Sequence, residues 1–317
     1  MLYFQQTRKK QIQTGKLLSA LSAIKKSWVV YVFLLPAFLS MGLVILYPLM
    51  RGIYFSFTDI DQYNMGNIFK DPSYVWVGIK NYVEVLFDPD SDLLPVLWQT
   101  MVWSVTNVFF HFTLGLSFAL LINKNFKGRG FYRLVLMIPW AVPAYVAAFS
   151  WRWMYNSEYG VFNALLTSLG FSPINWLSDP FWAMFAAIST NVWIGYPFMM
   201  VSLLAGLKSI PNNLYEAAMI DGSSKIHQFF HITLPMLKPV AFSVTLLGFI
   251  WTFNMFPIIY LVTQGGPSGS TEILATYAYR EAFENWNLAS ASTYGVIILS
   301  ILVVLSAVYS KATKYTG

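Results

Sequence analysis

Six long apolar runs constrain this chain more than any other feature of its sequence. They cover residues 28–50, 93–122, 134–155, 181–207, 240–263 and 288–310. A helix needs about 20 mostly apolar residues to cross about 30 Å of hydrocarbon. Because lipid offers no partner for backbone polar groups, each run is predicted to be a helix. Only 11% of the 317 residues are charged, so the sequence predicts an all-α integral membrane protein with six transmembrane helices.

The distribution of charge predicts how these helices are oriented. Fifteen of the 20 Lys and Arg residues lie before residue 28, in loops 123–133 and 208–238, and at the end of the chain. Twelve of the 14 Asp and Glu residues lie in the other connections. Since Lys and Arg concentrate on the cytoplasmic side, both termini and loop 208–238 are expected to be cytoplasmic. The net charge of +6 follows from this topology and gives no indication of nucleic acid.

The sequence divides into a membrane domain and two short flanking segments. Residues 1–27 alternate basic and apolar residues, which suits either an interfacial helix or a positive tail that sets the topology. Run 28–50 is too long for a signal-peptide core and no A-x-A site follows, so an uncleaved first span is expected. We therefore expect a permease domain over 28–311, including a cytoplasmic loop at 208–238, and a tail over 312–317.

Several chemistries are not expected of this chain. It has no cysteine, which excludes disulfides and thiolate chemistry. His227 and His231 have metal-ligand spacing, but no acidic ligand neighbours them, so no metal site is expected. No phosphate-binding G-x-x-x-x-G-K-[ST] motif and no combination of nucleophile and base is present. We expect neither catalysis nor a bound cofactor.

Loop 208–238 carries a pattern that predicts two short helices joined by a sharp turn. Pro211 suits the first turn of a helix over 212–221, and Gly222 can adopt the left-handed conformation that ends it. A serine at 223–224 can cap the second helix.

The second short helix is expected to run to about Ile232. Pro235 and Pro239 should prevent it from continuing into the next span. The first helix also offers small side chains and one carboxylate to a partner surface: Glu216, Ala217 and Ala218.

This loop resembles a known motif. Its pattern, E-A-A, three residues, G, nine residues, I-x-L-P, is similar to the cytoplasmic loop of membrane subunits of binding-protein-dependent ABC importers. The matching positions are Glu216, Ala217, Ala218, Gly222, Ile232, Leu234 and Pro235. The resemblance implies the type I importer transmembrane fold, and a loop that docks into a groove on a separate ATPase subunit. It also implies a second, similar membrane subunit, two ATPase subunits that bind ATP and Mg, and an extracytoplasmic binding protein. The resemblance places this assembly at the cytoplasmic membrane of a bacterium or archaeon.

Three further motifs resemble the sugar branch of this family, closest to the larger membrane subunit of maltose-type importers. They lie at Ile138–Tyr155, Asn191–Met200 and Thr263–Pro267. The resemblance covers roughly residues 28–317 and implies import of an oligosaccharide, either maltodextrin-like or acidic. The extra N-terminal spans and large outer insertion of the enteric maltose subunit have no counterpart here.

Polar and aromatic residues interrupt the fourth and fifth apolar runs. Polar groups in a bilayer usually face a bundle interior or a cavity, and amide and aromatic side chains suit sugar hydroxyls and ring faces. By resemblance, the substrate path would include Asn191, Trp193, Ile194, Gly195, Phe198, Trp251, Thr252, Asn254 and Met255. Thr252 and Met255 stand where the maltose protein has Asn. The alternative is that these groups only bond neighbouring helices.

Two single residues leave alternatives open. Arg152, at the outer end of the third run, can lie in an aromatic belt or attract an anionic sugar. His111 can be a helix contact or a proton relay, and a relay would favour an ion-coupled secondary sugar transporter. No Asp, Glu, Lys or Arg lies well inside any run, which counts against that alternative. A membrane enzyme is a third class that the missing catalytic groups disfavour.

Overall fold

The computed structural model describes residues 28–314 and consists of two parts, one ending at Tyr54 and one beginning at Phe55. Each part is described by itself. Segment 1–27, predicted to be basic and interfacial, lies outside the described residues, as does the end of the predicted tail.

The first part is a single apolar helical stretch. Residues Val32–Phe55 are long and apolar enough to cross a membrane. The helix contains one π-helical section, and its elements are α2 (Trp28–Met41), η1 (Gly42–Leu46) and α3 (Tyr47–Phe55).

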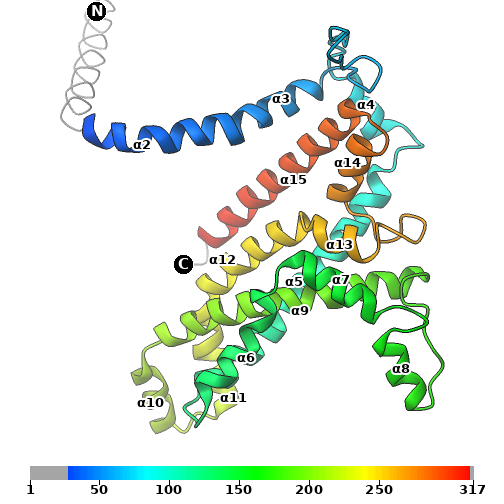
Figure 1. Cartoon of the computed structure of the whole chain (residues 1–317). Coiled ribbons are helices and arrows are strands. Elements are labelled where there is room, and N and C mark those ends of the chain that lie inside the picture. Colours follow the sequence, from blue (N-terminus) through cyan, green and yellow to red (C-terminus); the bar gives the residue numbers. More distant parts are fainter. Residues whose placement is uncertain (1–27, 315–317) are drawn as a thin grey trace, which may run out of the picture. The chain divides into compact units, whose positions relative to one another are not determined.

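The second part contains all the remaining helices (Figure 1). They are α4 (Lys80–Phe87), α5 (Leu93–Asn123), α6 (Arg129–Ala141), α7 (Ala144–Met154), α8 (Val161–Ser168), α9 (Pro180–Ser209), α10 (Asn212–Ile220), α11 (Lys225–Gln228), η2 (Phe229–Thr233), α12 (Leu234–Phe253), α13 (Phe256–Val262), α14 (Leu274–Phe283) and α15 (Leu288–Lys314). Over both parts, five helices are long and apolar enough to span a membrane, or six if the bent pair α6–α7 forms one span. The all-α membrane fold predicted from the sequence is confirmed. The short helices α4, α8 and α14 in the outer connections were not predicted.

The third predicted span, 134–155, is not one straight helix. Helices α6 and α7 meet at an angle of 90°. Pro143 has no N–H to donate, and Val142 before it is extended with ψ of 126°. A residue that precedes proline is disfavoured in the helical region, so the chain turns at this point.

The fifth predicted span, 240–263, begins earlier than the sequence suggested. Residues Lys225–Phe253 form one continuous span-length helix, so the prediction that Pro235 and Pro239 would interrupt it was wrong. The π-helical section η2 comes directly before Pro235, and its last bond runs from Leu234 N–H to the Phe229 carbonyl. A π turn shifts the hydrogen-bond register by one residue, and such local adjustment makes proline tolerable in membrane helices.

The same run is broken near its outer end, which the sequence analysis did not specify. Helix α12 ends at Phe253 and α13 starts at Phe256. Pro257 cannot donate to the Phe253 carbonyl, and its ring conflicts with a continuous helix there.

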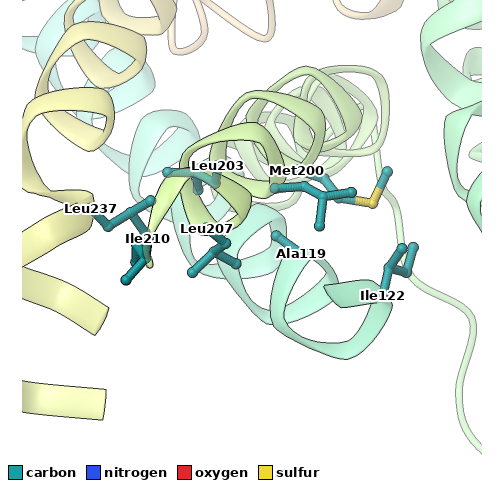
Figure 2. Close-up of a cluster of buried hydrophobic side chains, with 8 residues drawn as sticks. Ala119, Ile122, Met200, Leu203, Leu207, Ile210 and Leu237 are labelled. Atoms are coloured by element: carbon teal, nitrogen blue, oxygen red, sulfur yellow. The ribbon is translucent and has the colours of Figure 1, made fainter. Parts of the chain in front are cut away.

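The core of the second part lies where α5, α9 and α12 meet. Figure 2 shows side chains of all three helices in one buried cluster, made of Ala119, Ile122, Met200, Leu203, Leu204, Leu207, Ile210 and Leu237. A Cβ on Gly115 would lie 2.9 Å from the Met200 backbone nitrogen, so glycine permits the close approach of α5 and α9. Small residues at such crossings are characteristic of packed membrane helices.

Candidate functional site

Helix α10 ends in the sharp turn that the sequence predicted. Gly222 has φ of 76°, the left-handed conformation that favours glycine. Ser223 N–H donates to the Ala218 carbonyl at 2.8 Å and Gly222 N–H to the Met219 carbonyl at 3.1 Å. These two bonds form a Schellman motif, which satisfies carbonyls that a helix end otherwise leaves free. The sequence predicted Pro211 in the first turn of this helix. In the structure Pro211 is extended, with ψ of 131°, and the helix begins at the next residue.

The second arm of the turn starts at Ser224. Its Oγ accepts a hydrogen bond from His227 N–H at 3.2 Å, so Ser224 is the cap of α11. The Gln228 side chain donates to the Ser223 carbonyl at 3.1 Å. The turn is therefore held from both sides, and residues 212–233 form a defined helix–turn–helix, called the coupling segment below.

The coupling segment is attached to the membrane core along one face. The hydroxyls of Tyr215 and Thr233 lie 2.9 Å apart, which links α10 to the start of the span helix. Tyr215 and Ile232 also pack against the buried cluster that contains Leu237. The two arms of the segment cannot move separately without breaking this bond and this packing.

The turn of the coupling segment carries exposed apolar side chains. Ile220 is 87% exposed and Ile226 is 74% exposed, with Met219 close by in sequence and also exposed. Exposed apolar patches mark interaction surfaces. The sequence analysis missed these three residues, although apolar side chains on both sides of a turn glycine in a polar loop are a readable signal.

The seven residues that matched the importer motif divide between the two faces. Exposed are Glu216, Ala217, Gly222 and Pro235, and partly buried are Ala218, Ile232 and Leu234. Glu216 forms no ion pair with another residue in the described part of the chain. Its carboxylate is available to a cation on another surface.

The residues predicted to line a substrate path also divide. Asn191 and Thr252 are buried within the bundle, where Asn191 Nδ2 donates to Asn107 Oδ1 at 2.9 Å. Trp251 is exposed, and its ring centroid lies 4.9 Å from that of Phe198. Exposed or partly buried are Trp193, Ile194, Gly195, Phe198, Trp251, Asn254 and Met255. The structure thus offers one accessible aromatic and amide face and, behind it, bonds between helices.

His111 is a contact between helices in this structure. Its Nε2 lies 3.0 Å from the Asn191 carbonyl oxygen, and the ring is buried. A Cβ on Gly195 would overlap the His111 ring, so glycine is what allows the imidazole to fit against α9.

Arg152 is also held by the protein. Its Nη1 donates to the Leu261 carbonyl at 3.2 Å, near the C-terminal end of α13, where free carbonyls favour a cation. The neighbouring Trp151 ring lies 5.7 Å from Trp193. Arg152 therefore links α7 to α13 among aromatic side chains.

His227 and His231 stack in the second arm of the coupling segment. Their ring centroids lie 3.8 Å apart, and His231 Nδ1 is 3.0 Å from the His227 carbonyl. Within residues 28–314, no group of three or more His, Cys, Asp or Glu side chains is arranged to hold a metal ion.

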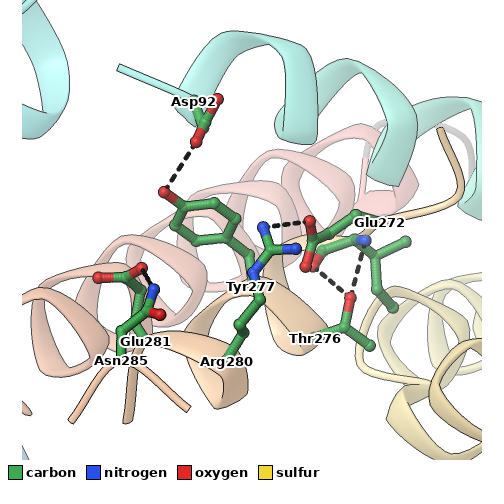
Figure 3. A network of polar contacts seen from close by, with 8 residues as sticks. Asp92, Glu272, Thr276, Tyr277, Arg280, Glu281 and Asn285 are labelled. Carbon is green, nitrogen blue, oxygen red and sulfur yellow. Dashed lines mark hydrogen bonds and ion pairs between the residues drawn. The ribbon is translucent and has the colours of Figure 1, made fainter. Parts of the chain in front are cut away.

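A polar network that the sequence analysis missed orders the connection after α13. Figure 3 shows Glu272 paired with Arg280 and Tyr277 bonded to Asp92. The Glu272–Arg280 distance is 2.5 Å, and the Glu272 side chain is 4% exposed. Burial raises the pKa of Glu272 to about 7, although Arg280 acts in the opposite direction. A buried carboxylate in a long connection gives no sequence signal, because its ionic partner lies eight positions away.

Several membrane-length helices and an exposed helix–turn–helix outside them define a class: multi-pass membrane proteins with a surface exposed to a partner. The family described as binding-protein-dependent transport system inner membrane component matches residues 111–312. The chain belongs to this family.

Individual relatives agree with this assignment. The chain is 42% identical over 247 residues to the trehalose/maltose transport system permease protein of Thermococcus litoralis, covering 77% of this chain and 82% of that protein. It is 35% identical over 281 residues to the sulfoquinovosyl glycerol transport system permease protein of Agrobacterium fabrum, covering 89% of each. A solved bacterial ABC transporter involved in the import of the acidic polysaccharide alginate superposes with a TM-score of 0.79 at 23% identity, over 93% of this chain and 98% of that chain. The last comparison shows the importer fold.

Proposed function

We propose that this chain is a membrane subunit of an ATP-driven importer that moves an oligosaccharide across the cytoplasmic membrane of a bacterium or archaeon. The observation that carries the proposal is the coupling segment, which is exposed and apolar at its turn and anchored to the membrane core through Tyr215, Ile232 and Thr233. Such a segment can receive force from a partner and pass it to a span.

The same proposal assigns the partners. A second, similar membrane subunit would complete the translocation path, and two ATPase subunits would bind ATP and Mg. This chain would bind no cofactor itself. An extracytoplasmic sugar-binding protein would deliver the substrate. The ATPase would contact the exposed motif residues Glu216, Ala217 and Gly222, together with Ile220 and Ile226.

A sugar is the substrate class that the relatives and the site both favour. The two related permeases named above belong to a trehalose/maltose transport system and a sulfoquinovosyl glycerol transport system. The accessible pair Phe198–Trp251 and the Asn254 amide would supply an aromatic face and a hydrogen-bonding group. We propose that the path carries maltodextrin-like or acidic oligosaccharides past these three side chains.

A pair of glycine variants tests the proposal. Gly222 and Gly170 both have left-handed φ values, 76° and 83°, and a Cβ at either position would meet nothing within 4 Å. Valine is strained at such a φ, so Gly222→Val and Gly170→Val disturb the backbone equally, one in the coupling segment and one after α8.

The chain should be expressed together with the products of its neighbouring genes, among which the proposal expects an ATPase and a binding protein. We expect Gly222→Val to lose co-purifying ATPase and sugar-stimulated ATP turnover by tenfold or more, while Gly170→Val keeps both. Equal retention of ATPase by the two variants would contradict the assignment of the coupling segment. Sugar uptake that persists when the ATPase is inactivated would contradict an ATP-driven importer.

A further inference from the structure

The break between α12 and α13 needs support from outside its own helix. Pro257 leaves the Phe253 carbonyl without its usual helical partner. Met255 N–H bonds the Thr252 carbonyl at 3.1 Å, which tightens the last turn of α12. The exposed side chains of Trp251 and Asn254 lie at this point, so the geometry of the break determines where they face.

Trp103 of α5 contacts the α12 side of this break directly and shares a buried cluster with residues of its α13 side. Its indole N–H donates to the Thr252 carbonyl at 2.8 Å, across helices. Its ring is fully buried in one cluster with Ile258 and Ile259, which belong to α13. One side chain therefore holds the end of α12 by a hydrogen bond and lies in the same buried cluster as the first turn of α13.

A buried polar chain joins α5 to α9 one helical turn after Trp103. Asn107 Nδ2 donates to the Trp103 carbonyl at 2.8 Å and Asn107 Oδ1 accepts from Asn191 at 2.9 Å. The carbonyl of Asn191 contacts His111 at 3.0 Å. Because unpaired polar groups in a low dielectric are costly, this chain strongly favours one arrangement of α5 and α9 around Trp103.

We infer that Trp103 is a positioning residue for the translocation path: its indole N–H sets the geometry of the α12–α13 break and so the direction in which Trp251 and Asn254 face. The inference rests on the proposed function in one respect, that these two side chains line the path. The hydrogen bond from α5 that holds the break can be tested without a transport assay.

The natural absence of cysteine makes a direct test possible. The substitution Asn254→Cys places a single reporter cysteine at the break. The control substitution Ser168→Cys places one at an exposed position at the end of α8, away from the break. Each reporter is combined with Trp103→Phe, which keeps an aromatic ring but removes the N–H donor. The rate of modification by a charged methanethiosulfonate reagent is measured on the full chain in membranes.

We expect Trp103→Phe to raise the modification rate at position 254 about fivefold, which corresponds to about 1 kcal/mol, and to change the rate at 168 less than twofold. If Trp103→Phe does not insert, benzothienylalanine at position 103 keeps the full ring volume without the donor and should give the same result. Unchanged or lower reactivity at 254, or an equal rise at both positions, would overturn the inference.

This outcome separates from that of the proposed function, because the labelling needs neither sugar nor ATPase. If the unsubstituted chain with its partners imports no sugar while Trp103→Phe raises the rate at 254, the function is refuted and the positioning role stands. If that chain imports sugar while Trp103→Phe leaves the rate at 254 unchanged, the positioning role is refuted and the function stands.

Discussion

The closest crossing of α5 and α9 supplies a prediction whose size follows from the structure. A Cβ on Gly115 would lie 2.6 Å from the Met199 Cβ and 2.9 Å from the Met200 backbone nitrogen. Neither atom is the end of a flexible side chain, so no rotamer change relieves the overlap. Gly115→Ala must instead push the two helices apart by about 1 Å, since carbon contacts favour about 3.5–4.0 Å.

The expected cost combines two opposing effects. Overpacking of a close-packed interior costs about 1–3 kcal/mol, whereas alanine in a helix is more favourable than glycine by about 0.5–1 kcal/mol. Gly115→Ala should therefore lower the free energy of unfolding by about 1–2 kcal/mol. Gly295→Ala in α15 is the matched control, because a Cβ there meets nothing within 4 Å, and it should raise stability by about 0.5–1 kcal/mol.

The assay is reversible unfolding of the full chain in mixed micelles with increasing denaturing detergent, followed by tryptophan emission. The two variants should differ by about 1.5–3 kcal/mol in the free energy of unfolding, with opposite signs relative to the natural chain. A Gly115→Ala protein as stable as Gly295→Ala would refute the conclusion that backbone proximity at α5–α9 requires glycine.

Two further predictions concern the outer side. The pKa of Glu272 in the folded chain is about 7, above its ordinary value of 4.5. The protonated carboxyl therefore contributes its whole share to the free energy of unfolding below pH 4.5, and this contribution is lost as pH rises through 7. The loss amounts to about 3 kcal/mol. Glu272→Gln should remove this pH dependence in thermal unfolding while Glu84→Gln, from the exposed pair with Lys80, keeps it, and an unchanged slope in Glu272→Gln would show that burial is not the cause. Arg152→Gln should lower uptake of neutral and acidic oligosaccharides by the same factor, because its guanidinium is bonded to the Leu261 carbonyl; loss of acidic uptake alone would instead support a role in attracting anions.

Prolines show where the sequence predicted the fold and where it could not. Hydropathy located the spans, since a bilayer demands apolar length whatever the packing. Pro143 and Pro257 break their runs, yet Pro235 and Pro239 lie inside a continuous helix. The difference comes from the residues around each proline: an extended Val142 precedes Pro143, whereas a π turn precedes Pro235. A hydropathy profile does not distinguish a proline that breaks a helix from one that the helix accommodates.

The candidate site was predictable to the extent that its chemistry is local. The left-handed Gly222 and the cap at Ser224 follow from rules that involve a few adjacent residues, and both are present. The path residues depend on how three helices meet at a break, so the burial of Asn191 and the exposure of Trp251 could not be read from their spacing. Trp103 was missed for the same reason, because its bond to Thr252 joins positions 149 residues apart.

The continuity of the fifth span connects the coupling segment to the proposed substrate path at the α12–α13 break. Lys225–Phe253 is 29 residues long, or about 43 Å at 1.5 Å per residue. One end belongs to the coupling segment and is tied to α10 through Tyr215 and Thr233, and the other end is the break that Trp103 holds. A tilt of about 10° at the coupling end displaces the far end of a rod of that length by about 7 Å. A helix interrupted at Pro235, as the sequence alone suggested, would lose most of that displacement at the interruption, whereas the continuous helix connects the coupling segment to the break.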